Sequence, residues 1–114
     1  MVILDETFLG TEKKYLIEIQ STGFDMDRDD FSIVLRRGAN KVEIPKSQLI
    51  VEPYTIVNDG QEVTKNNYYF VFNTRSLGPG EASITVTAHV PDTDFDDNLR
   101  DEVDKFNFLK IKSV

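Results

Sequence analysis

The chain has 114 residues, of which 39% are apolar and 29% are charged, a composition that suits one soluble globular domain. It contains no cysteine and one histidine, His89, which excludes disulfides, thiol nucleophiles and histidine-cluster metal sites within one chain. Its 20 acidic and 13 basic residues give a net charge of -7, opposite in sign to a typical nucleic-acid binder. We therefore expect a binding or structural protein rather than an enzyme, with no cofactor.

The first residues, Met1 to Leu4, form a short apolar run that Asp5 and Glu6 follow at once, without the basic start of a secretory signal. No stretch approaches the roughly 20 apolar residues of a membrane span, and we expect no membrane partner. Residues 1–12 precede the first clear strand. They are expected to form an N-terminal arm or an edge strand, followed by one β-sandwich domain over residues 13–114.

Alternation of apolar and polar residues predicts strands over residues 13–20, 31–36 and 41–44. Turn residues separate these strands at Ser21–Gly23 and at Arg37–Asn40. The pattern is that of half-buried strands joined by short connections.

The middle of the chain predicts two short strands and a hairpin turn. Residues 49–51 are an apolar run that Pro53 interrupts, and residues 54–57 resume the pattern. The dipeptide Asp59-Gly60 is a strong signal for the turn of a β-hairpin.

Residues 68–72, Tyr-Tyr-Phe-Val-Phe, are apolar on both faces and predict a central strand covered on both sides. In a two-layered sandwich only one face of such a strand belongs to the core. The other set, Tyr69 and Val71 or their alternates, then needs a second cover, and a second subunit is one candidate.

The sequence Leu-Gly-Pro-Gly over residues 77–80 predicts a tight turn before the clearest strand of the chain, residues 82–90. His89 falls on the polar side of this strand among threonines, where we interpret it as an exposed strand histidine. A role as a ligand or at a subunit interface is the alternative.

The C-terminal region predicts one short helix and one strand. Leu99, Val103 and Phe106 have helical spacing, so one or two turns of helix are expected over 98–106. A last strand is expected over 106–111. The apolar positions change parity at its centre, which indicates a β-bulge or two buried faces.

About seven short strands with regular turns predict a single antiparallel immunoglobulin-like β-sandwich, with a short helical turn near the C-terminus.

Two acidic clusters, Asp25–Asp30 and Asp92–Asp97, begin like a calcium-binding loop. Each lacks glycine at the sixth position, and the twelfth position is Arg36 or Val103 rather than glutamate. We interpret both clusters as solvated loops that keep sheet edges soluble. A calcium site unlike an EF-hand is the alternative, and no metal ligand is assigned.

A predicted hairpin carries Arg36, Arg37 and Lys41, with Lys46 close behind. This basic patch could face the acidic loops of a neighbouring copy. Ordinary surface charge is the alternative interpretation.

The segment from Phe72 to Val103 joins the Leu-Gly-Pro-Gly turn, the long alternating strand, Val-Pro-Asp, an acidic loop with a phenylalanine, and Arg-Asp-Glu. In this order it resembles the small immunoglobulin-like sandwich proteins of tailed phages and prophages of gut bacteria, including the crAss-like phages. The resemblance implies a non-enzymatic structural protein of the virion, made in the bacterial host cytoplasm. Capsid decoration, head fibre and fibre anchoring are the roles it suggests, and it implies no catalytic residues.

We therefore expect a homo-oligomer whose partners are other virion proteins and copies of itself. The expected interface residues lie in the N-terminal arm and the basic hairpin: Val2, Ile3, Leu4, Phe8, Arg36 and Arg37. The first alternative is an extracytoplasmic adhesin-like sandwich that binds glycan or calcium through the acidic loops. The least favoured alternative is a small hydrolase that uses paired carboxylates.

Overall fold

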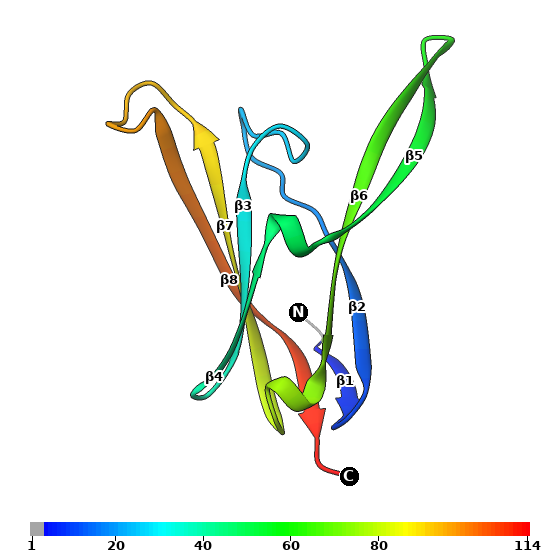
Figure 1. Ribbon diagram of the computed structural model, residues 1–114, viewed down its shortest axis with the longest axis vertical. Coiled ribbons are helices and arrows are strands. Elements are labelled where there is room, and N and C mark those ends of the chain that lie inside the picture. Colours follow the sequence, from blue (N-terminus) through cyan, green and yellow to red (C-terminus); the bar gives the residue numbers. More distant parts are fainter. Residues whose placement is uncertain (1–3) are drawn as a thin grey trace.

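The computed structural model describes residues 4–114, which fold into two packed β-sheets (Figure 1). Over these residues the chain forms eight strands and two single 3-10 turns. The elements are β1 Asp5–Phe8, β2 Glu12–Ile17, β3 Phe31–Arg37, β4 Asn40–Pro45, η1 Lys46–Gln48, β5 Ile50–Asn58, β6 Gln61–Asn73, η2 Thr74–Ser76, β7 Gly80–Pro91 and β8 Leu99–Lys112.

One sheet has five strands in the order β1-β8-β7-β3-β4, and the other has three in the order β2-β6-β5. This confirms the predicted immunoglobulin-like sandwich, with eight strands in place of about seven. All neighbours are antiparallel except β1, which lies parallel to β8 at the edge of its sheet. The chain then crosses to the other sheet through Gly10 and Thr11, where the Thr74 hydroxyl accepts a hydrogen bond from the Gly10 amide at 2.8 Å.

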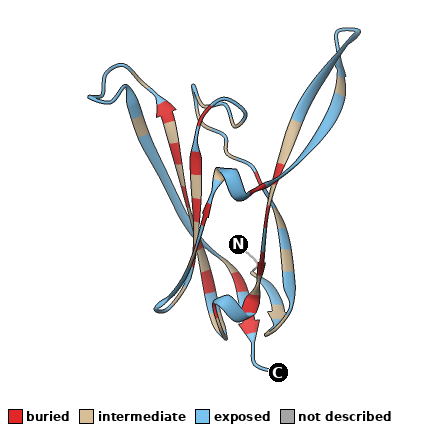
Figure 2. Cartoon of the chain, viewed as in Figure 1, coloured by how far each residue is buried: buried red, intermediate tan, exposed pale blue. Residues whose placement is uncertain are grey.

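The core fills the space between the inner faces of the two sheets (Figure 2). Alternate residues of β3 and β7 point inward, as the sequence pattern predicts, and β6 faces them with three buried aromatic rings. The central buried side chains are Phe31, Ile33, Leu35, Tyr68, Phe70, Phe72, Ala82, Ile84 and Val86. Tyr15 of β2 stacks on Phe70 with ring centroids 5.5 Å apart, which joins β2 to the same core.

The predicted pieces at 49–51 and 54–57 form one strand, β5, because Pro53 lies in an edge strand, where a missing amide hydrogen breaks no ladder. Asp59 and Gly60 both have positive φ, 51° and 79°, as the predicted two-residue hairpin turn requires. The resulting β5–β6 ribbon extends away from the body of the sandwich (Figure 1).

The helix expected over 98–106 is wrong, because these residues belong to β8 and pair with β7. Leu99 pairs opposite Pro91 at the start of this ladder, and the hydrogen bonds it provides outweigh a helical spacing of only three apolar residues. The predicted change of parity is confirmed as a bulge. Phe108 falls between the residues paired with Ala82 and Ser83, so Phe108 and Leu109 both contact the core.

Candidate protein-binding surface

The outer face of the three-stranded sheet carries a row of apolar side chains. The register places every second residue of β2, β5 and β6 on this face, because cross-strand partners point the same way. Its apolar members are Leu16, Ile50, Tyr54, Ile56, Val63, Tyr69 and Val71. Leu16 and Val71 are 45% and 48% exposed, and no element among residues 4–114 covers them. This face is therefore the one that sequence reasoning expected to need a second cover.

One ion pair crosses the centre of this outer face. The Lys14 ammonium lies 2.9 Å from a Glu52 carboxylate oxygen and 4.5 Å from the centre of the Tyr69 ring. The pair shields Tyr69 from water and divides the apolar row into a part near β2 and a part near the tip of the ribbon.

The ribbon extends the same apolar row beyond the body of the protein. Tyr54 and Val63 are exposed on its outer face, and Val57, 73% exposed, lies on its inner face near the tip. A two-stranded ribbon on its own is marginally stable in water. A projecting ribbon that exposes several large apolar side chains in this way is typical of a segment that packs on another protein.

The outer face of the five-stranded sheet has a different composition. Its β7 residues are small and hydroxylated, Ser83, Thr85 and Thr87, and Ser32 lies beside Thr87 on β3. His89 is on this face too, half-buried, with its Nδ1 2.6 Å from an Asp101 carboxylate oxygen. Two exposed apolar side chains of β8 lie on this face as well, Leu99 and Val103, which are 45% and 64% exposed. The β7 positions of this face are therefore hydrophilic, and its β8 positions are mixed.

The acidic cluster Asp25–Asp30 is a clasp between the sheets. Asp25 accepts hydrogen bonds from the Asp27 and Arg28 amides, and Asp29 forms an ion pair with Arg28 at 2.8 Å. Asp27 accepts hydrogen bonds from the Tyr68 hydroxyl and the Asn66 amide of β6. The loop that leads into β3 of the five-stranded sheet is thus hydrogen-bonded to β6 of the three-stranded sheet.

The pKa values of this clasp reflect these contacts. Hydrogen bonds from Arg28 hold the pKa of Asp29 at about 2, and the hydrogen bond from Tyr68 lowers the pKa of Asp27. Burial, with the nearby Asp27 carboxylate, raises the pKa of Tyr68 to about 12. These carboxylates are engaged within the chain rather than free in a solvated loop.

The second cluster, Asp92–Asp97, turns the chain between β7 and β8. Asp92 accepts a hydrogen bond from the Asp94 amide and forms an ion pair with Arg100, and both contacts lower its pKa. Among residues 4–114, no three His, Asp or Glu side chains are grouped so that they could hold a metal ion.

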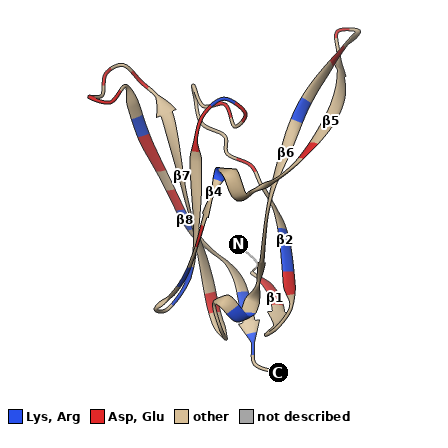
Figure 3. Cartoon of the chain, in the orientation of Figure 1, with Lys and Arg blue, Asp and Glu red and all other residues tan. Residues whose placement is uncertain are grey.

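The two arginines of the basic hairpin have different surroundings. Arg36 is exposed, whereas the Arg37 guanidinium donates to the Leu77 carbonyl at 2.8 Å and packs on Gly78 and Gly80. A Cβ on Gly80 would lie 2.8 Å from the Arg37 side chain, so glycine is required at this contact. Lys46 lies elsewhere, bonded to the Asp29 carbonyl at 2.8 Å. Of the four predicted basic residues, Arg36 and Lys41 form the exposed hairpin patch (Figure 3).

The predicted N-terminal interface is seen only in part. Val2 and Ile3 lie outside the described residues, and Leu4 is half-buried. Phe8 is 57% exposed at the end of β1, with the Lys112 ammonium 5.8 Å from its ring centre. Segment 1–12 thus contains an edge strand, β1, in the five-stranded sheet.

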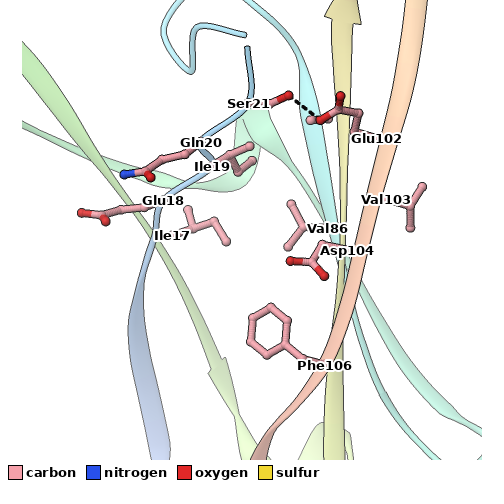
Figure 4. A pocket seen from close by; sticks show the side chains of 11 residues that line it. Ile17, Glu18, Ile19, Gln20, Ser21, Val86, Glu102, Val103, Asp104 and Phe106 are labelled. Atoms are coloured by element: carbon pink, nitrogen blue, oxygen red, sulfur yellow. Dashed lines mark hydrogen bonds between the residues drawn. The ribbon is translucent and has the colours of Figure 1, made fainter. Parts of the chain in front are cut away.

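A groove of about 240 Å³ opens on the flank between the end of β2 and the first half of β8 (Figure 4). Its floor is apolar, and its rim carries the carboxylates of Glu18, Glu102 and Asp104. The Ser21 hydroxyl donates to Glu102, and His89 lies on the opposite face of β7, so the groove does not pair this serine with a histidine.

The sequence predicts that one face of β6 is uncovered, but it does not predict that this face extends onto β5, where Ile50, Tyr54 and Ile56 alternate with less apolar neighbours.

Comparison with protein-family models, curated proteins and solved structures finds no match to this chain. Over residues 4–114 the chain forms no helix of the length and apolarity that crossing a membrane requires.

Proposed function

We propose that this chain is a non-enzymatic structural protein of a phage virion that acts by assembling with other virion proteins and with copies of itself. The observation that carries the proposal is the apolar outer face of the three-stranded sheet, with Leu16, Tyr54, Val63 and Val71 exposed. Several large apolar side chains exposed on one face are unfavourable in water unless a partner covers them. The resemblance of residues 72–103 to virion sandwich proteins supports a virion as the particle into which the protein assembles.

The first experiment is the native mass of the purified protein by multi-angle light scattering, with and without EDTA. We expect a defined oligomer that EDTA leaves unchanged. Val63→Glu should abolish the oligomer, because it places a charge within the apolar row. Thr85→Glu is the matched control, since it adds the same charge to the other outer face.

A monomer whose melting temperature rises with calcium would contradict the assembly proposal. A ligand that binds only the folded chain stabilises it by mass action, so such a rise would favour the adhesin-like alternative. Asp94→Asn and Asp96→Asn would then test the loop between β7 and β8 as the calcium site.

A further inference from the structure

The apolar outer face of the three-stranded sheet is patterned along its length in a way that matches its own reverse. We propose that this face docks on the same face of a second copy, with the two β6 strands antiparallel about a two-fold axis in the plane of contact. The inference rests on the proposed function and specifies the partner.

The rows of this face follow from the strand register. Ile50 lies beside Tyr69, Glu52 beside Asn67, Tyr54 beside Lys65, and Ile56 beside Val63. Two apolar rows therefore enclose two rows that contain polar residues. Reversing the order of the rows exchanges the two apolar rows with each other and brings Tyr54 of one copy over Glu52 of the other.

A two-fold axis between the central rows makes specific pairs. Ile50 of one copy lies over Ile56 of the other, and Tyr69 lies over Val63. At the centre, Lys65 of each copy comes beside Glu52 of the other. The contact therefore buries Ile50, Ile56, Val63 and Tyr69. It also brings Lys65 toward Glu52, whose carboxylate Lys14 approaches at 2.9 Å within its own chain.

The charges on this face do not oppose contact between two copies, although the net charge of the whole chain does. The chain has a net charge of -7, so two copies repel each other in general. The outer face of the three-stranded sheet carries two lysines, Lys14 and Lys65, and two glutamates, Glu12 and Glu52. A surface of zero net charge with both signs present can meet itself without like-charge repulsion.

The size of the face sets the strength of the dimer. β5 and β6 lie side by side over nine residues of each strand, roughly 30 Å, and two strands are about 10 Å wide. Each copy then buries roughly 300 Å², and the pair about 600 Å², which is the size of a weak contact. We expect a dimer that dissociates on dilution.

The edge of β5 is a less favourable contact than the face. Pro53 lies in the middle of this edge strand and offers no amide hydrogen to an added strand. A second copy that extended the sheet through β5 would lose ladder hydrogen bonds at its centre. Packing on the outer face avoids this loss.

The decisive test mixes two charge variants. Lys65→Glu places two glutamates together at each contact of a homodimer, and Glu52→Lys places two lysines together. Each variant alone should dimerise at least about 10-fold more weakly than the unaltered chain. In a one-to-one mixture, both contacts of the mixed dimer again join one glutamate to one lysine, so this dimer should regain most of the affinity. Sedimentation velocity gives the dissociation constants, and native mass spectrometry identifies the mixed dimer.

Lys105→Glu and Glu81→Lys are the matched controls on the other outer face and should leave dimerisation unchanged. Melting curves of all four variants confirm folding before they are mixed. An oligomer that Val63→Glu abolishes, but that the mixture does not restore, would overturn this two-fold contact and leave the proposed function standing. An unaltered chain that stays monomeric at high concentration would overturn the dimer and remove self-assembly from the proposed function.

Discussion

The outward positions of β7 and β6 follow the same alternation of residues and carry opposite kinds of side chain. On β7 the outward positions are Ser83, Thr85 and Thr87, which water solvates well. On β6 the outward positions include Val63 and Val71, both exposed. Where the two sheets pack, the inward residues Tyr68, Phe70 and Phe72 of β6 are already buried in the shared core, so core formation does not explain its apolar outward residues.

The difference shows how many faces of a strand need to be shielded from water. A strand with polar outward residues, such as β7, needs a cover on its inner face only. A strand that is apolar on both faces, such as β6, is complete only with a second cover. In the described part of this chain, the five-stranded sheet covers only one face of β6.

The largest expected effect tests the contrast between the two faces of β6 itself. Phe70→Ala should lower the free energy of unfolding by about 3–5 kcal/mol, because it leaves a cavity among stacked rings. Val71→Ala should cost less than about 1 kcal/mol, because this side chain is half exposed. Urea denaturation at high dilution, where the chain is monomeric, measures both.

Equal losses from Phe70→Ala and Val71→Ala in the dilute monomer would break the comparison, since Val71 would then be packed within one chain. At higher concentration we expect Val71→Ala to lose additional stability relative to the unaltered protein, because burial in an oligomer adds to its contribution.

A second, smaller effect compares inward and outward arginines of β3. Arg37→Ala should lower the free energy of unfolding by about 1–2 kcal/mol, because it removes a hydrogen bond to the Leu77 carbonyl and the packing on Gly80. Arg36→Ala, on the solvated outer face, should change it by less than about 0.5 kcal/mol. Thermal melting of the two variants checks this order, and a larger loss for Arg36 would show that the five-stranded outer face is not merely solvated.

The sandwich and most strand positions could be predicted because alternation records which side of a strand is buried. The central position of β6 in its sheet, the Asp59-Gly60 turn and the bulge at Phe108 all follow from local residues. The helix over 98–106 was wrong because β8 here alternates weakly. Its inward positions between Leu99 and Phe106 include Glu102 and Asp104, which face a groove rather than the core.

The candidate surface was only partly predictable for a related reason. The aromatic run 68–72 shows that one of its faces needs a second cover, but only the strand register decides that this face holds Tyr69 and Val71. Only the β5–β6 register places Tyr54 and Ile56 on the same face as Val63, and this register depends on the length of the hairpin. The internal roles of Asp27 and Arg37 depend on contacts with residues about 40 positions away, which local patterns do not record.

A third expected effect concerns the clasp that holds the two sheets together. The pKa of Asp29, about 2 in the folded chain, lies below the value of about 3.9 for an unfolded aspartate. The unfolded chain therefore binds the proton more readily, and stability is lost as the pH falls from about 4 through 2. Melting temperatures between pH 7 and 2 should decline in this range.

Asp29→Asn should be less stable than the unaltered chain at pH 7 and should lose less on acidification. Asp97→Asn removes the same charge at an exposed loop position and is the control. A steep acid decline that persists unchanged in Asp29→Asn would show that other carboxylates hold the faces in place.

The smallest expected effect belongs to the ion pair on the apolar outer face. Lys14 and Glu52 have side chains 45% and 50% exposed, so a double-mutant cycle with Lys14→Gln and Glu52→Gln should give a coupling of about 0.2–1 kcal/mol. Raising the salt concentration should reduce this coupling, because water and ions reach both groups. A coupling well above 1 kcal/mol in the dilute monomer would mean that the pair is shielded within one chain. The outer face of the three-stranded sheet would then be covered without a partner, and its contrast with the serine and threonine face would disappear.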